Sequence, residues 1–150
     1  MGRFWRRAFL FMAVMSSEQA LAFCWEETAR RYDIEPELLQ AIAAVESDNR
    51  PEAVNPANRN GSRDIGLMQI NSIHLPRLLQ SGITEERLLR EPCLSVEVAA
   101  SILAEFIQRF GYNWTAVGAY NAGTGPEREA LRMRYAEKIW SRYEALMQQR

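Results

Sequence analysis

The sequence places one glutamate at the end of an apolar helical segment, where a carboxyl group could transfer protons. Apolar residues recur three and four apart from Leu38 to Val45, and Glu46 follows them directly. Burial beside Val45 would raise the pKa of Glu46, and a raised pKa would make it a proton donor near neutral pH. The alternative is an ordinary solvated glutamate near a helix C-terminus, since helices commonly carry exposed Glu. This segment alone leaves both interpretations open.

Two further strings mix apolar and amide side chains in a way that suits the wall of a cleft. Residues 66–71 read Gly-Leu-Met-Gln-Ile-Asn after a long polar run, and residues 119–123 read Ala-Tyr-Asn-Ala-Gly. Each string also has a structural interpretation. Met68 could pack in the core, and Gln69 could tie loop backbone together. Ser47 and Asn121 could cap helix ends.

Helical patterns separated by turn residues cover most of the chain and would position these strings. Helices are expected at Cys24–Tyr32, from Pro36 to Glu46, at Leu75–Leu79, at Thr84–Leu89 with Thr84 as N-cap, from an N-cap at Ser95 to Gly111, and from about Glu127 to Met147. The buried face of the last helix is expected at Leu131, Tyr135, Ile139, Tyr143 and Leu146. The polar run 49–64 is dense in turn-forming residues and predicts a loop or short β-hairpin. The 150 residues therefore predict one mainly α domain.

The N-terminal segment has the pattern of an export signal. Three arginines precede the apolar run Ala8–Met15, and small residues at 20–22 supply the cleavage spacing. Residues 1–22 are therefore predicted to be a signal peptide and residues 23–150 the mature domain. The apolar run is far shorter than the roughly 20 residues that cross a bilayer. No stable membrane anchor is expected after cleavage.

The charge of the mature chain gives no support to a nucleic-acid partner. Loss of residues 1–22 removes three arginines and Glu18 from 18 basic and 19 acidic side chains, which leaves a net charge of about −3. Binding to a phosphate backbone needs an excess of basic residues.

Both cysteines, Cys24 and Cys93, lie in the predicted mature domain. An exported chain with two cysteines most simply pairs them, and the bridge would close a loop of about 70 residues, worth roughly 4 kcal/mol of stability. A nucleophilic cysteine or a metal ligand lacks supporting residues, because His74 is the single histidine and no cysteine cluster exists. No metal or cofactor is expected, and a structural or surface role is expected for His74.

The order and spacing of Glu46-Ser47, residues 66–71 and residues 119–123 resemble the lytic transglycosylase family of goose-lysozyme-like enzymes. The resemblance covers about residues 24 to 145 and includes the pairs Cys24-Trp25 and Pro92-Cys93. It is closest to the small, single-domain members that serve secretion systems and pili. It implies a lysozyme-like single domain with a polar loop or short β-hairpin beside the active-site cleft, and a periplasmic location.

The resemblance implies cleavage of the bond between N-acetylmuramic acid (MurNAc) and N-acetylglucosamine (GlcNAc) in peptidoglycan, with formation of a 1,6-anhydro ring. Glu46 would be the only catalytic carboxylate, with a raised pKa. The substrate-binding residues implied by the family pattern are Ser47, Met68, Gln69, Tyr120 and Asn121, with Tyr120 placed to hydrogen-bond near Glu46 or the sugar. The expected partners are glycan strands and components of a secretion or pilus apparatus.

Two rival functions are compatible with the same residues. A hydrolytic lysozyme needs a second carboxylate, for which Asp48 is the candidate by proximity and Asp64 through the fold. A spacing of two residues along a helix would point Asp48 away from Glu46. A non-catalytic wall-binding or scaffold protein would keep the cleft without the chemistry.

Overall fold

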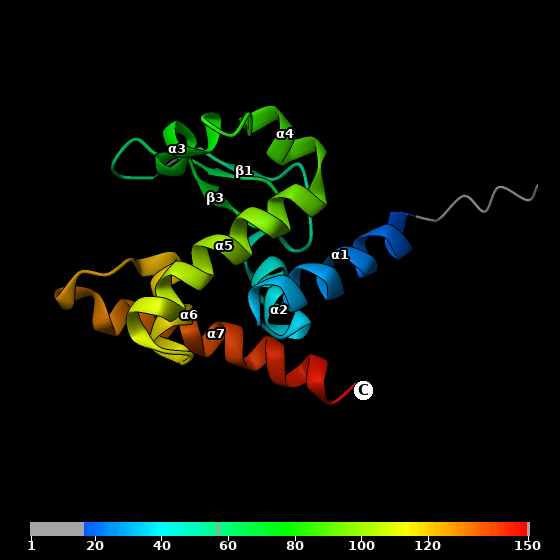
Figure 1. Ribbon diagram of the computed structural model, residues 1–150. Coiled ribbons are helices and arrows are strands. Elements are labelled where there is room, and N and C mark those ends of the chain that lie inside the picture. Colours follow the sequence, from blue (N-terminus) through cyan, green and yellow to red (C-terminus); the bar gives the residue numbers. More distant parts are fainter. Residues whose placement is uncertain (1–16, 57, 150) are drawn as a thin grey trace, which may run out of the picture.

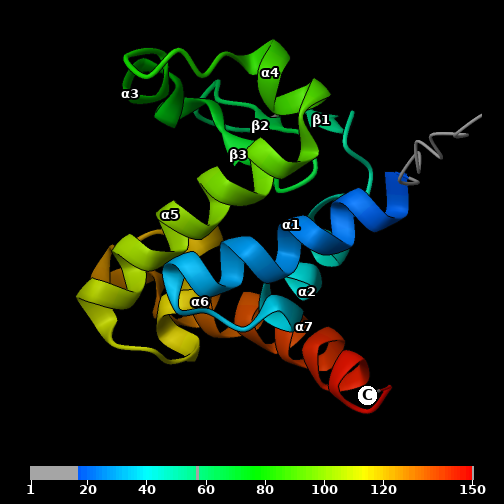
Figure 2. The same cartoon turned by 45° about the vertical axis from the view of Figure 1, so that its right-hand side comes forward.

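A long helix, α5, lies between two groups of secondary-structure elements (Figures 1 and 2). The computed structural model describes residues 17–56 and 58–149. Figures 1 and 2 show a small sheet with helices α3 and α4 on one side of α5, and helices α2, α6 and α7 on the other. The helices are α1 (Ser17–Tyr32), α2 (Pro36–Ser47), α3 (Leu75–Leu79), α4 (Glu85–Arg90), α5 (Pro92–Phe110), α6 (Trp114–Ala122) and α7 (Glu129–Met147). Short 3-10 turns, η1 (Ser72–His74) and η2 (Pro126–Arg128), precede α3 and α7.

The mainly α fold predicted from the sequence is confirmed. Helix α2 begins at Pro36, where a proline is tolerated because the first backbone N–H groups of a helix have no partner within it. Its apolar side is fully buried at Leu39 and Ile42. Asp48 ends the helix in a left-handed conformation, with φ 54°. This ending leaves Glu46 in the last turn, at the edge of the core.

The polar run after α2 and the 66–71 string that follows it form a three-stranded antiparallel sheet in the order β1 (Val54–Asn55), β2 (Asp64–Ile65) and β3 (Ile70–Asn71). Asp64 lies on the central strand, opposite Asn55 on one side and Asn71 on the other. Gly66 follows with φ +75°, and a Cβ there would come within 2.9 Å of the Leu88 carbonyl oxygen. Only glycine lets the turn press against α4 at this point.

Helices α5 and α1 both begin earlier than the sequence pattern predicts. Helix α5 begins at Pro92, so Ser95 lies inside the helix and is not its N-cap. Its side chain is fully buried, and its hydroxyl accepts a hydrogen bond from the Met68 N–H at 3.3 Å. Helix α1 begins at Ser17 instead of Cys24.

Residues 1–16, which hold the charged and apolar parts of the predicted signal peptide, lie outside the described residues. Among the residues that the structure does describe, no helix is both long enough and apolar enough to cross a membrane.

The last helix differs in its start and in its buried face. Helix α7 begins at Glu129, and Leu131 is 40% exposed, whereas Arg132 is 4% exposed. A buried charge needs partners, and Arg132 pairs with Glu129 and donates to the carbonyl oxygens of Gly123 and Gly125. These bonds turn Arg132 inward and leave Leu131 at the surface, which a hydrophobic pattern alone does not predict.

Helices α6 and α7 approach each other closely at Gly118. A Cβ at this position would overlap the backbone carbonyl of Arg132. The spacing between the two helices is therefore set by the absence of a side chain on α6.

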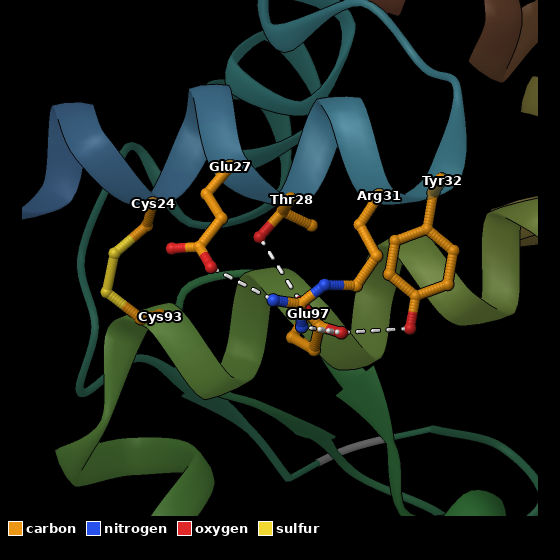
Figure 3. A network of polar contacts seen from close by, with 7 residues as sticks. All are labelled: Cys24, Glu27, Thr28, Arg31, Tyr32, Cys93 and Glu97. Atoms are coloured by element: carbon orange, nitrogen blue, oxygen red, sulfur yellow. Dashed lines mark hydrogen bonds and ion pairs between the residues drawn. A yellow bond between two sulfur atoms is a disulfide. The ribbon is translucent and has the colours of Figure 1, made fainter.

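The expected disulfide joins Cys24 of α1 to Cys93 of α5, with their Cα atoms 5.5 Å apart (Figure 3). Further along the same two helices, the Glu97 carboxylate accepts hydrogen bonds from Arg31 at 2.8 Å and from the Tyr32 hydroxyl at 3.0 Å. Figure 3 shows these contacts on the facing sides of α1 and α5. The N-terminal helix is therefore fixed to the central helix by a covalent bond and by a polar cluster.

We expect loss of the disulfide to lower the free energy of unfolding. In the double variant Cys24→Ser/Cys93→Ser, the expected loss is about 4 kcal/mol, because the bridge closes a loop with a sequence separation of 69. Urea denaturation of the variant and of reduced wild type measures the loss. An unchanged midpoint in both samples would contradict a stabilising role for the bond.

Candidate active site

Glu46 projects from the last turn of α2 into a cleft of about 570 Å³. The cleft is also lined by side chains from the polar run, the 66–71 string and α6, which are far apart in the sequence. They include Asn58, Asp64, Gln69, Asn71, Tyr120 and Asn121. The fold therefore brings together the three strings that carried the resemblance.

The hydroxyl of Tyr135 on α7 donates a hydrogen bond to Oε1 of Glu46. Tyr135 is 7% exposed, and a buried tyrosine hydroxyl normally finds such a partner. The helical pattern predicted Tyr135 on the buried face of the last helix but gave no indication of its contact with Glu46. The available signal was a hydroxyl at a core position, which requires a polar group nearby.

Burial raises the pKa of Glu46 from 4.5 to about 7, as the sequence analysis predicted. The buried site disfavours the charged form, and the negative charge of Asp64 adds to the increase. The Tyr135 hydrogen bond and the positive charge of Lys138 lower the pKa and partly offset this effect. Glu46 is therefore divided between its acid and carboxylate forms near neutral pH.

Asp64 is the second carboxylate of the cleft. The amides of Asn58 and Asn71 donate to its two oxygens at 3.0 and 2.7 Å, and Asn55 donates at 3.2 Å. The first rival candidate, Asp48, is exposed at the C-cap of α2 and does not line this cleft. If a second carboxylate acts with Glu46, the geometry selects Asp64.

Tyr120 supports the cleft wall through the backbone of residues 66–71. Its hydroxyl donates to the Met68 carbonyl oxygen at 2.7 Å, so its bond is to this string and not to Glu46. Gln69 lines the cleft, and its side-chain amide donates to the carbonyl oxygens of Gly66 at 2.9 Å and Ala53 at 3.1 Å. The amide nitrogen of Gln69 therefore ties loop backbone together, as the structural interpretation of this residue expected.

Ser47 and Met68 lie behind the cleft. The side chain of Met68 is fully buried, as in the core-packing alternative, and it does not line the cleft. Ser47 is 3% exposed, and its hydroxyl bonds the Leu67 carbonyl oxygen at 2.7 Å. Neither side chain lines the cleft in this structure, and both pack behind its wall.

His74 also lines the cleft. Burial, together with the charge of Arg77, lowers the pKa of His74. Across residues 17–56 and 58–149, no group of three or more such side chains could hold a metal ion.

Glu46 and Asn121 also line two further hollows, each of about 440 Å³. One extends past β1 and includes Arg50 and Asn55. The other extends along α7 and includes Arg134, Tyr135 and Lys138. Glu46 therefore stands where three hollows meet, so a ligand longer than one sugar ring could extend past it in more than one direction.

The sequence of the chain is similar to those of known proteins. The sequence model of the transglycosylase SLT domain matches residues 23–143. The chain is 52% identical over 133 residues to the invasion protein IagB of Salmonella typhimurium, which covers 89% of this chain and 82% of that protein. It is 51% identical over 122 residues to protein IpgF of Shigella flexneri, covering 81% and 80%. It is also 36% identical over 121 residues to a putative peptidoglycan-binding-like protein of Escherichia coli K12, covering 77% of each.

The matched range contains Glu46, Asp64 and Tyr135 together with both cysteines of the disulfide. The chain therefore belongs to the transglycosylase SLT domain family.

Proposed function

We propose that this protein is a peptidoglycan lytic transglycosylase that cleaves the MurNAc–GlcNAc bond with Glu46 as its catalytic residue. The observation that carries the proposal is the Glu46 carboxyl group, with a pKa raised to about 7, at the meeting point of three hollows. Family membership supports a peptidoglycan substrate.

In the first step, protonated Glu46 donates its proton to the oxygen that links C1 of MurNAc to GlcNAc. The C1–O bond breaks, GlcNAc leaves with the proton, and positive charge develops at C1. A general acid works best when its pKa lies near the operating pH. Burial of Glu46 provides this match.

In the second step, the Glu46 carboxylate accepts the proton of the C6 hydroxyl of the same MurNAc. O6 bonds to C1, the 1,6-anhydro ring closes, and Glu46 returns to its acid form without consuming water. The nucleophile belongs to the sugar that it attacks, and such arrangements reach effective concentrations of about 10⁵ M or more. Tyr135 favours the carboxylate form between the two steps, because its hydrogen bond lowers the pKa of Glu46.

A hydrolytic lysozyme is the second candidate, because Asp64 lines the same cleft as Glu46. Hydrolysis would use Asp64 to activate water or to form a glycosyl intermediate. The two carboxylate oxygens of Asp64 already accept hydrogen bonds from Asn58 and Asn71. The two candidates differ in product, since hydrolysis leaves a reducing MurNAc end.

We expect purified sacculi digested with the protein to release muropeptides that end in 1,6-anhydro-MurNAc, detected by mass spectrometry. Glu46→Gln should lose at least about a hundredfold in rate, because an amide cannot donate the proton. Reducing ends without the anhydro form would identify a hydrolase. Equal rates for Glu46→Gln and wild type would exclude Glu46 as the acid, and an inactive wild type would favour the non-catalytic scaffold.

The stability of Glu46→Gln against pH tests whether Glu46 has a raised pKa and shows that the variant is folded. The raised pKa means that native Glu46 holds its proton to higher pH than the unfolded chain does, so wild-type stability falls as pH rises from about 4.5 through about 7. Gln does not titrate. The variant should therefore match wild type below pH 4 and exceed its free energy of unfolding at pH 8 by about 3 kcal/mol.

A matched pair of tyrosine variants tests the assignment of Tyr135. The wild-type rate should fall as pH rises through about 7, because Glu46 must be protonated. Tyr135→Phe should move this fall to higher pH, since the lost hydrogen bond had lowered the pKa of Glu46. Tyr120→Phe should leave the fall in place, because its hydroxyl bonds Met68. An equal shift in both variants, measured as kcat/KM against pH, would contradict the assignment.

We also propose that residues 1–22 direct the chain to the periplasm, where it opens the wall locally for a secretion apparatus or pilus. The Salmonella relative is named an invasion protein, which supports such a role. A deletion strain is expected to assemble fewer of these machines, counted by electron microscopy and restored by wild type but not by Glu46→Gln. Normal assembly in the deletion strain would contradict this role.

A further inference from the structure

A smaller hollow of about 220 Å³ lies where residues of α2, α5, α6 and α7 meet. Its aliphatic lining consists of Leu38 of α2, Ile107 of α5 and Val117 of α6. We call it the aromatic hollow, because tryptophan and tyrosine rings form much of the remaining lining. Among the described residues, none that lines it also lines a hollow at Glu46. The aromatic hollow is therefore separate from the catalytic cleft.

Three of its aromatic side chains, Trp114, Trp140 and Tyr143, form one cluster. The ring of Trp114 lies 5.2 Å from that of Trp140 and 6.1 Å from that of Tyr143, with interplanar angles of 87° and 69°. Trp140 is 44% exposed. The face of an aromatic ring carries partial negative charge and attracts cations, tryptophan most strongly. The cluster therefore favours a positively charged ligand.

The charge of the aromatic hollow favours the same kind of ligand. Glu35 is the one charged side chain among the described residues that line it. The Tyr112 hydroxyl donates a hydrogen bond to Oε2 of Glu35, which leaves Oε1 for another donor. Within the part of the chain that the structure describes, Glu35 forms no ion pair, and it is exposed. A carboxylate is therefore available beside the aromatic rings.

An apolar lining beside one carboxylate fits a ligand with an apolar stem and a cationic end. A lysine side chain has this form, since its four-carbon stem ends in an ammonium group with three donors. The volume of about 220 Å³ corresponds to roughly seven water molecules. The aromatic hollow therefore has room for one such side chain.

The apolar surface continues beyond the aromatic hollow along α7. Trp114 and Trp140 also line a neighbouring hollow of about 400 Å³, together with Met133, which is 44% exposed. The two charged side chains of that second hollow, Arg134 and Glu137, have opposite signs. Tryptophan is enriched among the residues that dominate protein–protein binding energy. A protein segment covers both hollows, whereas a free amine covers only one.

We infer that the aromatic hollow is a docking site for a partner protein that inserts a lysine side chain. The lysine ammonium group pairs with Glu35, its stem packs on the aromatic cluster, and the neighbouring residues of the partner cover Met133. The inference goes beyond the proposed function and does not depend on it, because the aromatic hollow and the cleft are lined by different residues.

The test is an NMR titration of the protein that follows the indole N–H signals of Trp114 and Trp140. The probe is Nα-acetyl-lysine methylamide, which is expected to shift both signals with a Kd in the millimolar range. Its Nε-acetylated form keeps the stem but not the charge and should bind at least about threefold more weakly.

A matched pair of glutamate variants locates the binding site. Glu35→Gln should weaken binding of the lysine probe about two- to fivefold, the range for one exposed ion pair, and leave binding of the acetylated probe unchanged. The control is Glu26→Gln, an exposed glutamate on α1 outside the aromatic hollow, which should bind both probes as wild type does.

Three results would overturn the inference. The first is equal binding of the two probes, or an unchanged affinity for the lysine probe in Glu35→Gln. The second is an equal loss in Glu26→Gln, which would assign the effect to net charge. The third is binding of n-butylammonium without binding of the capped lysine, which would restrict the hollow to free amines. None of these results bears on the proposed function, which is judged by the anhydro product.

Discussion

The acid–base chemistry proposed for the cleft depends on the burial of one ionisable group, Glu46. Glu46 can be half-buried at the end of α2 because Tyr135 satisfies one of its oxygens, and the hydrogen bond requires α7 to pack beside α2. The same burial that gives the carboxyl group a useful pKa also costs stability when the group ionises. The disulfide and the Glu97 cluster between α1 and α5 contribute stability away from the groove, where they do not constrain the site.

Most of the fold could be predicted from periodicity and turn chemistry. Pro36, Thr84 and Gly111 mark helix ends because they act through local backbone geometry, and the structure confirms all three. The predictions that Ser95 is an N-cap and that Leu131 is buried were wrong for a different reason. Serine is typical of an N-cap and leucine of a core face, but here long-range partners decided: the Met68 N–H for Ser95 and the bonds of Arg132 for Leu131.

The candidate site was predicted in part. Strings of residues indicated Glu46, Gln69, Tyr120 and Asn121, and all four line the cleft. Periodicity could not show that Tyr135 donates a hydrogen bond to Glu46, because the two residues are 89 positions apart in the chain. Local patterns also could not separate the side chains that line the cleft from Ser47 and Met68, which support it from behind.

Gly118 shows how a position without a side chain can affect acid chemistry elsewhere. Helix α6 carries Tyr120 and Asn121, α7 carries Tyr135, and the two helices touch where Gly118 meets the backbone of Arg132. A single added methyl group would force these helices apart and carry the Tyr135 hydroxyl away from its carboxyl partner. The close packing that places Tyr135 beside Glu46 therefore depends on a residue that has no side chain and does not titrate.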